Sequence, residues 1–433
     1  MPDLMKLWTP APDMLAGAFE RCGVDIRIVG GAVRDAIGGR KHKDVDLATP
    51  ATPIEMLRLG ERLGLRTVPL LAEAEARPSE WEKGGLKHGT VPFVMDGPDG
   101  PEMVEVTTLR ADVETDGRHA RVAFVRDFET DAARRDFTFN AMSVDRRGRL
   151  FDCFGGVSDL QSGIVRFVGS ADQRIREDYL RILRFFRFRG RYGSPDGGLL
   201  DLGPEDGATF DAIRRNRAGM GRISGERIWS EMRQILGSGP SFLQLKAMHL
   251  TGVTDAVGLP FGHESRRDAC VQAYGAACCG AHPAMVLGLL LRPTARDAEP
   301  RVRPCDIQER WKLSGGDREF AEFAFTHWHM ADAPYSAFLD LALLPRARRD
   351  LLGSLLAAFG RSTDAAAILM PLPEFPVRGA DLVARGISPG PAVGQALSRL
   401  HGAWKDGGYL ATAEELLELE PPTVVTSDSG PQK

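Results

Sequence analysis

A Gly-Gly pair followed by an Asp-x-Asp sequence constrains the fold of this chain more than any other feature. Residues 26–29 form a compact β-branched run that stops at Gly30 and Gly31, and residues 32–37 then have helical character. This order predicts a strand, a glycine turn and a short helix. Because glycine lacks a Cβ, a bulky anion can approach the backbone of the turn closely, and the amides at the helix start would point toward it. We therefore expect a phosphate group at Gly30 and Gly31.

The segment that follows predicts a second strand with two carboxylates. Side chains alternate along a strand, so Asp44 and Asp46 would project from one face while their apolar neighbours turn inward. Neighbouring carboxylates repel each other, and a hard cation such as Mg²⁺ relieves the repulsion. Alone, a Gly-Gly pair is usually only a turn and Asp-x-Asp a solvated strand edge. Joined by a dozen residues that include Arg34 and Lys43, they predict metal-assisted phosphoryl transfer.

These motifs also carry a family resemblance. Gly-Gly-Ala-Val-Arg-Asp followed by Lys-Asp-Val-Asp resembles the nucleotidyltransferase head of the class II CCA-adding enzymes and the related bacterial poly(A) polymerases. The resemblance implies an α/β, polymerase-β-like head with a mixed sheet that binds CTP or ATP. Residues 134–142 resemble the family's Arg-Arg-Asp-Phe-Thr-x-Asn-Ala motif, which implies that Arg135 binds the triphosphate. Without the family, adjacent arginines would be interpreted as a solvated pair.

A third carboxylate is a candidate member of the metal site. The turn sequence at residues 96–100 lies between two alternating runs and predicts a hairpin. Glu105 lies on the second arm with its valine neighbours turned the other way, so it can face Asp44 and Asp46. A strand glutamate exposed at the rim explains the pattern equally well.

Two head segments are predicted to be irregular. Residues 71–85 resemble an insertion, because the corresponding link in the family is generally shorter, and this puts substrate entry beside the site in doubt. Residues 112–133 are polar, and we expect them to form a mobile loop over the nucleotide.

Residues 176–188, Arg-Glu-Asp-Tyr-Leu-Arg-Ile-Leu-Arg-Phe-Phe-Arg-Phe, predict an amphipathic helix. At about 100° per residue, Arg181, Arg184 and Arg187 share one face, opposite an apolar face. The simple interpretation is a solvated helix face with an Asp178 to Arg181 ion pair, worth roughly a few tenths of a kcal/mol.

The same residues suit the chemistry of a nucleobase. A carboxylate accepts from the amino group of cytosine or adenine and a guanidinium donates to a ring acceptor, whereas uracil presents these groups in the wrong order. The family's Glu-Asp-x-x-Arg motif works in this way, which implies that Asp178 and Arg181 select the base. Tyr179 stands where many members have proline.

The rest of the chain predicts an all-α neck, body and tail. Residues 223–232 resemble a later helix motif of the family, in which a glutamate and an arginine brace the neck. Beyond residue 250 the chain is rich in Ala and Leu, with candidate helices at 283–291, 318–327, 347–359 and 392–401. We expect a catalytic head at 1–155, a neck with the nucleotide-selecting helix at 156–250, an RNA-binding body and tail at 251–420, and a disordered end at 421–433.

Composition restricts which binding partners and which cell compartment are expected for this chain. The formal net charge is -4, yet arginines crowd between residues 174 and 233, so a local basic surface for tRNA is expected. The six cysteines include no Cys-x-x-Cys pair, which argues against structural zinc. No apolar run reaches bilayer length and no signal peptide is evident, so we expect a cytoplasmic protein that contacts no membrane.

We predict a template-independent RNA nucleotidyltransferase that adds C, A or both to tRNA 3′ ends from CTP and ATP, with Mg²⁺ as cofactor. A poly(A) polymerase is the nearest alternative, but no Gly-Arg-Arg-Phe-like segment follows Asp46. A non-catalytic RNA-binding protein of this fold is the other alternative. It would be expected to have lost the metal carboxylates or the Asp178 and Arg181 pair, and all four residues are present.

Overall fold

In a computed structural model, the chain forms two compact units, residues 1–328 and residues 329–433. The boundaries predicted at 155 and 250 fall inside the first unit and stay predictions. Lys43, the insertion at 71–85 and the end at 421–433 lie outside the described residues. No helix among the described residues is long and apolar enough to cross a bilayer. The structure describes residues 2–42, 44–68, 89–97, 100–115, 120–193, 204–239, 241–261, 267–293, 302–344 and 347–420.

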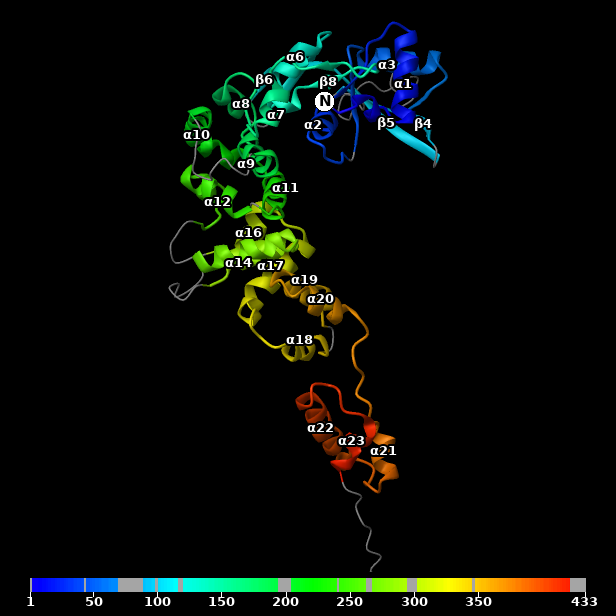
Figure 1. The fold of residues 1–433 in the computed structure, drawn as a ribbon, viewed down its shortest axis with the longest axis vertical. Helices are drawn as coiled ribbons and strands as arrows, with labels where there is room; N and C mark the ends of the chain where they lie inside the picture. The colour runs from blue at the N-terminus through cyan, green and yellow to red at the C-terminus, as the bar shows by residue number, and fades with distance from the viewer. Residues whose placement is uncertain are drawn as a thin grey trace, which may run out of the picture. The chain divides into compact units, whose positions relative to one another are not determined.

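The head, drawn in blue and cyan in Figure 1, is built on a sheet of seven strands. Their order is β3-β4-β5-β2-β1-β8-β9. β2 and β5 are parallel, and the other neighbouring pairs of this sheet are antiparallel. The sheet is therefore mixed, as predicted. Its strands are β1 (Arg27–Val29), β2 (Asp46–Thr49), β3 (Arg66–Thr67), β4 (Thr90–Gly97), β5 (Gly100–Thr108), β8 (Ser143–Val144) and β9 (Leu150–Phe151).

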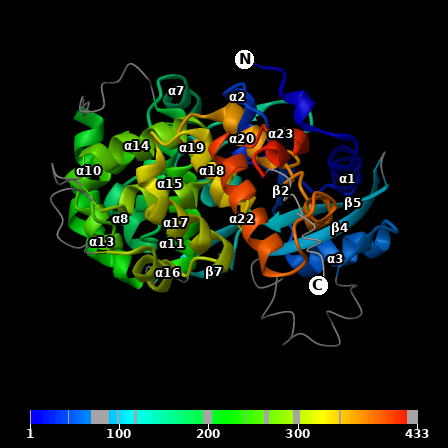
Figure 2. The ribbon, with the colours of Figure 1, turned by 90° about the horizontal axis from the view of Figure 1, so that it is seen from below.

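Two helices, α1 (Pro10–Arg21) and α3 (Pro53–Arg62), cover one face of β4 (Figure 2). Phe93 on that face is fully buried and packs edge-on against Phe19 of α1, with ring centroids 5.5 Å apart. At the start of α3, the Glu55 carboxylate accepts the Thr52 backbone N–H at 2.7 Å and the Thr52 hydroxyl accepts the Glu55 N–H, which completes a capping box. The opposite face of the sheet is left for the site.

The prediction that residues 112–133 form a loop is wrong where the structure describes this segment. Strands β6 (Arg110–Thr115) and β7 (Ala120–Phe124) form a two-stranded antiparallel sheet, and α6 (Phe128–Ala133) follows. Asp127 caps α6, because its carboxylate accepts the Thr130 N–H at 2.8 Å. The apolar run at residues 122–125 and this cap were the overlooked signals, because the residues around them are mostly polar.

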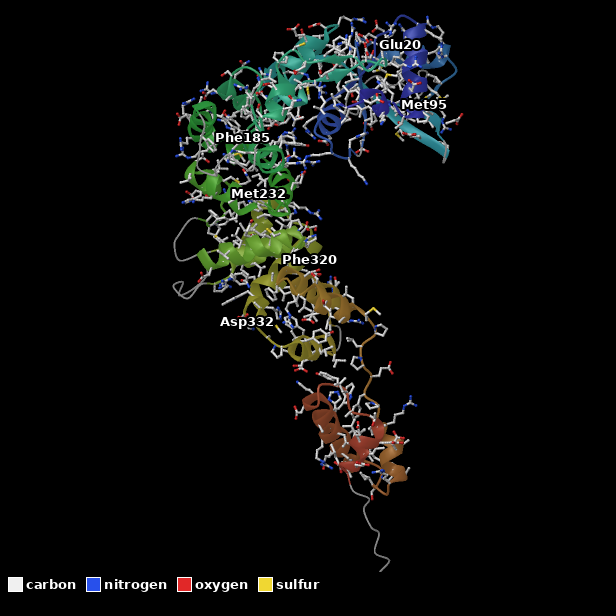
Figure 3. The ribbon with its side chains drawn as sticks, in the orientation of Figure 1. Glu20, Met95, Phe185, Met232, Phe320 and Asp332 are labelled. Carbon is white, nitrogen blue, oxygen red and sulfur yellow. The ribbon has the colours of Figure 1, made fainter. Side chains whose placement is uncertain are left out.

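A cluster of phenylalanines joins the head to the helices that follow it. Phe137 and Phe139 belong to the Arg-Arg-Asp-Phe-Thr-Phe motif and are fully buried. Phe137 packs edge-on against Phe188 of α9 (Arg181–Tyr192) at 5.4 Å, and Phe139 does so at 5.5 Å. Phe185 lies in the same core (Figure 3). Burying these rings fixes the head motif against α9, so the polar residues of both segments face one cavity.

The remainder is helical, as predicted, and α15, α17, α19 and α22 confirm the four candidate helices within a few residues. The first unit also contains α2 (Gly31–Ile37), α7 (Gly156–Gln161), α8 (Ala171–Glu177), α10 (Pro204–Asn216), α11 (Gly225–Leu236), α12 (Ser241–Leu250), α13 (Val253–Val257), α14 (Arg267–Cys278), α15 (Pro283–Leu291), α16 (Pro304–Trp311) and α17 (Gly315–His327). The second contains α18 (Tyr335–Ala342), α19 (Arg349–Ala358), α20 (Ser362–Leu369), α21 (Gly379–Ala384), α22 (Pro391–Asp406) and α23 (Ala413–Glu418). Short 3₁₀ segments are η1 (Leu4–Leu7), η3 (Thr138–Asn140), η4 (Arg217–Arg222) and η6 (Trp328–Met330).

Candidate active site

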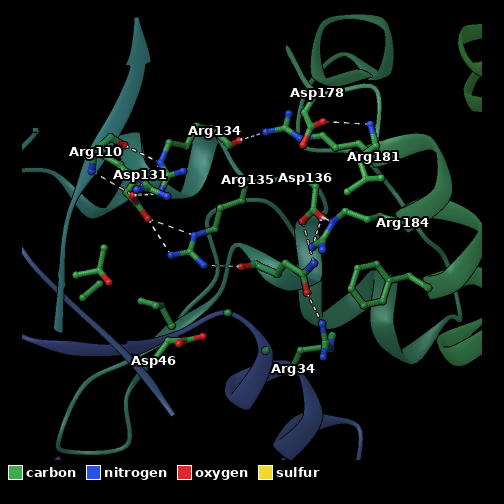
Figure 4. A pocket seen from close by; sticks show the side chains of 18 of the residues that line it. Arg34, Asp46, Arg110, Asp131, Arg134, Arg135, Asp136, Asp178, Arg181 and Arg184 are labelled. Atoms are coloured by element: carbon green, nitrogen blue, oxygen red, sulfur yellow. Dashed lines mark hydrogen bonds and ion pairs between the residues drawn. The ribbon is translucent and has the colours of Figure 1, made fainter. Parts of the chain in front are cut away.

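A cavity of about 650 Å³ lies where the head sheet meets α9 and α11 (Figure 4). Its walls bring together residues that are far apart in the sequence, and in the view of Figure 4 Arg135 lies between Asp46 and Asp178. The predicted residues that line the cavity are Gly30, Gly31, Arg34, Asp46, Arg135, Asp178, Arg181, Arg184 and Arg187.

The structure places an arginine side chain close against the glycine turn. Gly30 has a φ of 72°, a conformation that favours glycine, and α2 begins at Gly31. A Cβ added to Gly30 would lie 2.9 Å from Nη1 of Arg135. The absence of a side chain at Gly30 therefore lets the Arg135 guanidinium lie against the turn, beside the place expected for a phosphate.

One buried carboxylate, that of Asp131, holds two arginines of the cavity wall. It accepts from Nη2 of Arg134 at 2.7 Å and from Nη2 of Arg135 at 2.9 Å. It also accepts the backbone N–H of Arg110 at 3.2 Å. Burial alone would raise the pKa of Asp131, but the nearby Arg135 and Arg134 charges bring that pKa below its usual value. Asp131 therefore stays ionised and fixes both guanidinium groups.

A second chain of contacts crosses the cavity from α2 to α9. Nη1 of Arg34 donates to Oδ1 of Asn140 at 2.6 Å, and Nδ2 of Asn140 donates to Oδ1 of Asp136 at 2.9 Å. The other oxygen of Asp136 accepts from Arg184 at 2.6 Å. Burial alone would raise the pKa of Asp136. The Arg184 charge and the hydrogen bonds that the Asp136 carboxylate accepts outweigh this effect, so its pKa lies below the usual value. The predicted phosphate-binding Arg34 is thus oriented through Asn140.

The arginine face of α9 is confirmed, since Arg181, Arg184 and Arg187 all line the cavity. Glu231 of α11 holds two of these residues, with Oε2 2.9 Å from Nε of Arg187 and Oε1 3.8 Å from Nη1 of Arg184. Burial raises the pKa of Glu231, and both arginine charges oppose that rise. The fully buried side chains of the other face are Ile182, Leu183 and Phe186.

The expectation that Asp178 lies on the same helix as Arg181 is wrong. α8 ends at Glu177, Asp178 is extended, and α9 begins at Arg181. The Asp178 carboxylate accepts the backbone N–H of Leu180 at 3.1 Å, and this local bond competes with helix continuation. Nor do Asp178 and Arg181 pair with each other. Asp178 accepts from Nη2 of Arg227 on α11 at 2.7 Å, and Arg181 donates to Glu177 at 2.7 Å.

The three predicted carboxylates line a second cavity, which shares Asp46 with the first. Asp44 precedes β2 and Asp46 is its first residue. Leu47 of β2 is in register with Val106 of β5, so Glu105 comes one residue before that pair on the neighbouring strand. Within the described ranges, however, no three acidic, histidine or cysteine side chains are close enough together to hold a metal ion. Glu105 therefore remains a prediction.

The electrostatics of Asp46 differ from those of the arginine-bound acids. Partial loss of water around its carboxylate, which remains exposed on one side, raises the pKa of Asp46; the nearby Arg135 charge lowers it, and the Asp44 charge raises it further. The Asp44 and Asp46 charges thus repel each other. This repulsion and the all-oxygen donors fit a hard divalent cation.

The chain has relatives that match it over nearly its full length. It is 35% identical to "CCA tRNA nucleotidyltransferase 1, mitochondrial" of Danio rerio, over 95% of this chain and 90% of the relative. The chain belongs to the CCA tRNA nucleotidyltransferase family. The protein of the same name from Homo sapiens is 34% identical, over 96% and 91% of the two chains.

Matches to family domains and solved structures agree with membership in the CCA tRNA nucleotidyltransferase family. Residues 26–166 match the "Poly A polymerase head domain" and residues 206–260 the "Probable RNA and SrmB- binding site of polymerase A". The Bacillus stearothermophilus CCA-adding enzyme in complex with CTP is 26% identical and has a TM-score of 0.63, over 93% of this chain and 94% of that chain. The Thermotoga maritima CCA-adding enzyme complexed with a tRNA has a TM-score of 0.63 over 96% of each chain, and at 18% identity it shows the shared fold.

Sequence analysis of this CCA tRNA nucleotidyltransferase family member did not predict several of the residues that form the cavity. Asp131 had a detectable signal, because it lies three and four residues before Arg134 and Arg135 on the α6 segment. Arg227 was expected only to brace the neck, yet it lines the cavity and binds Asp178. Asn140 lies in the Arg-Arg-Asp motif, but nothing local indicated that it binds Arg34.

Proposed function

We propose that this chain adds C and A to the 3′ end of tRNA from CTP and ATP, releasing pyrophosphate. The observation that carries the proposal is one cavity lined by a glycine turn, fixed arginines, Asp46 and the Asp178 to Arg181 segment. The names of the full-length relatives support it.

The proposed nucleotide site divides into a phosphate part and a base part. Arg34 and Arg135, held by Asn140 and Asp131, meet the triphosphate beside the glycine turn. Asp178 accepts from the amino group of the base and Arg181 donates to a ring acceptor. Arg184 and Arg187 add positive charge along the wall between these parts. Because hydrogen bonds and ion pairs already fix these arginines, little side-chain entropy is lost on binding.

Asp44 and Asp46 are the residues proposed to hold Mg²⁺. When bound, Mg²⁺ lowers the pKa of the attacking RNA 3′-hydroxyl and neutralises charge on the phosphates. Asp44 and Asp46 accept the cation because their mutual repulsion favours it. Arg135 lies close enough to Asp46 to lower its pKa, so the phosphate-binding and metal-binding groups adjoin.

The proposed tRNA surface lies on the neck. Several arginines between residues 174 and 233 remain exposed outside the cavity. If they bind phosphates, the logarithm of tRNA affinity falls linearly with the logarithm of salt concentration, with a slope of about -0.7 to -0.9 for each phosphate contacted. A salt-independent affinity contradicts this surface. The exposed arginines are Arg176, Arg215, Arg217, Arg222 and Arg233.

The experiment that tests the proposed function supplies purified protein and Mg²⁺ with tRNA ending before C, after the first C, or after the second C. Each radiolabelled nucleotide is added separately, and the products are resolved at single-nucleotide length. We expect C on the first two substrates and a single A on the third, with no use of UTP. Failure to extend any of these substrates contradicts the activity.

The poly(A) polymerase alternative gains some support from the name of the matched head domain. It predicts long A tracts on all three substrates and no use of CTP, so the same gel separates the two functions. A non-catalytic RNA-binding protein predicts tRNA binding without any extension. A cytoplasmic location remains part of the proposal, and fractionation of the source cells tests it.

A further inference from the structure

Tyr179 and Gly219 form a contact behind the proposed base-selecting residue. Because Asp178 has an extended backbone, its side chain and that of Tyr179 point to opposite sides. Asp178 lines the cavity, whereas Tyr179 lies against η4, where a Cβ added to Gly219 would overlap its ring carbons. The Arg222 guanidinium lies 5.7 Å from the centre of the same ring. A bulky ring therefore packs directly on the Gly219 backbone.

One continuous segment, residues 217–236, thus holds the dipeptide from both sides. Its first part, η4, contacts the Tyr179 ring, and its second part, α11, supplies Arg227 for the ion pair with Asp178 at 2.7 Å. An ion pair that is partly exposed is a weak restraint by itself. The packed ring limits the backbone rotation that would let the Asp178 carboxylate move with Arg227.

We propose that Tyr179, through its packing on Gly219, is a positioning residue that holds Asp178 in the orientation required to distinguish C and A from U. This inference rests on the proposed role of Asp178 in base selection. It adds a specificity determinant that touches no substrate. It also assigns a purpose to Tyr179, which by the family resemblance stands where many members have proline.

The deciding variant is Gly219→Ala, and the chain offers a matched control. Gly219 has no left-handed backbone, so alanine suits its conformation and the added methyl acts only by displacing the Tyr179 ring. Gly221 lies in the same η4 segment, also without a left-handed backbone, and a Cβ there meets nothing within 4 Å. Gly221→Ala therefore makes the same chemical change without touching the ring.

The measurement is the ratio of kcat/KM for CTP to that for UTP, on tRNA lacking its terminal CCA. We expect Gly219→Ala to lower this ratio by about threefold to tenfold, less than the tenfold or more expected for Asp178→Ala. Gly221→Ala should leave it unchanged. In a Tyr179→Ala background, where the ring is absent, Gly219→Ala should have no further effect, because the two changes act through one contact.

The outcomes separate this inference from the proposed function. If Asp178→Ala lowers the ratio and Gly219→Ala does not, the positioning role is wrong and base selection by Asp178 stands. If Asp178→Ala leaves the ratio unchanged, the proposed base selection itself fails. Equal effects of Gly219→Ala and Gly221→Ala also overturn the positioning role. Should Gly219→Ala not fold, Tyr179→Ala, which only removes atoms, decides the matter: an unchanged ratio overturns the proposal.

Discussion

The two ends of the site, an arginine-lined cavity and a carboxylate-lined cavity that share Asp46, hold their charged groups in opposite ways. At the arginine end, buried carboxylates fix the guanidinium groups, as Asp131 does for Arg134 and Arg135 and Asp136 does for Arg184. At the carboxylate end, Asp44 and Asp46 are exposed and repel each other. The arginine end is therefore organised before substrate arrives, whereas we propose that a cation completes the carboxylate end.

This difference predicts that removing a carboxylate has different consequences at the two ends. A buried carboxylate between arginines supports both the fold and the site, so its loss must lower stability as well as nucleotide binding. An exposed carboxylate contributes little to stability, so its loss should affect chemistry alone. Substitutions at each end therefore test the comparison directly.

The largest effect is expected for Asp46→Ala. Without this carboxylate the proposed Mg²⁺ site loses a ligand, and the rate of nucleotide incorporation should fall by about a thousandfold or more. The free energy of unfolding in urea should change by less than about 0.5 kcal/mol. The control is Asp96→Ala, which removes an exposed carboxylate from a different strand, β4, and should leave the rate unchanged. Near-normal turnover of Asp46→Ala would remove the metal assignment.

Asp131→Asn should show the opposite balance. The change leaves two arginine charges without their buried partner, so we expect the free energy of unfolding to fall by about 3 kcal/mol. The KM for CTP should also rise as Arg135 loses its orientation. Asp211→Asn removes a carboxylate that pairs with Arg214 at the same 2.7 Å, but on the surface, and should cost less than about 1 kcal/mol. Equal losses from the two variants would contradict a special role for the buried acid.

Asp178→Ala tests a residue whose arginine partner is only partly buried. Without the carboxylate, Arg181 can still donate to a uracil carbonyl, and nothing repels O4 of that base. The ratio of kcat/KM for CTP to that for UTP should fall by about tenfold to a hundredfold, equivalent to about 1 to 3 kcal/mol. Turnover of CTP should fall less, because the carboxylates proposed to bind Mg²⁺ are unchanged. A parallel drop for both nucleotides, with their ratio preserved, would make Asp178 a structural residue.

The features that the sequence predicted correctly are local ones. The turn at Gly30 follows from glycine chemistry, and the arginine face of α9 follows from the 3.6-residue period. The pairs that complete the site are distant in sequence: Arg34 and Asn140 are 106 residues apart, and Asp178 and Arg227 are 49 apart. Tertiary packing brings them together, and no local pattern encodes it.

The local errors also have physical causes. The break before α9 was missed because the Asp178 carboxylate bonds the backbone two residues ahead, a contact that helical periodicity does not register. The pairing of β6 with β7 was missed because polar residues surround the short apolar run at residues 122–125. Whether Glu105 joins the metal carboxylates depends on side-chain distances that strand alternation alone does not set.

The smallest expected effect concerns acid pH, and it separates the two ends without mutation. The pKa of Asp46 is raised, whereas the pKa values of Asp131 and Asp136 are lowered. Asp46 therefore protonates first as the pH falls. The stability contributed by Asp131 and Asp136 is present above the unfolded-state value of 3.8 and is lost only as the pH falls through their lower folded-state values.

Because a proton on Asp46 competes with the cation, the Mg²⁺ concentration for half-maximal rate should rise as the pH falls, approaching about tenfold per pH unit below that pKa. The melting temperature measured without nucleotide should stay constant across the same interval. Using the Mg²⁺ requirement rather than the rate removes the pH dependence of the attacking hydroxyl itself. If the Mg²⁺ requirement stays flat until the protein unfolds, the two ends titrate as one, and the contrast between a fixed arginine end and an ion-completed carboxylate end is wrong.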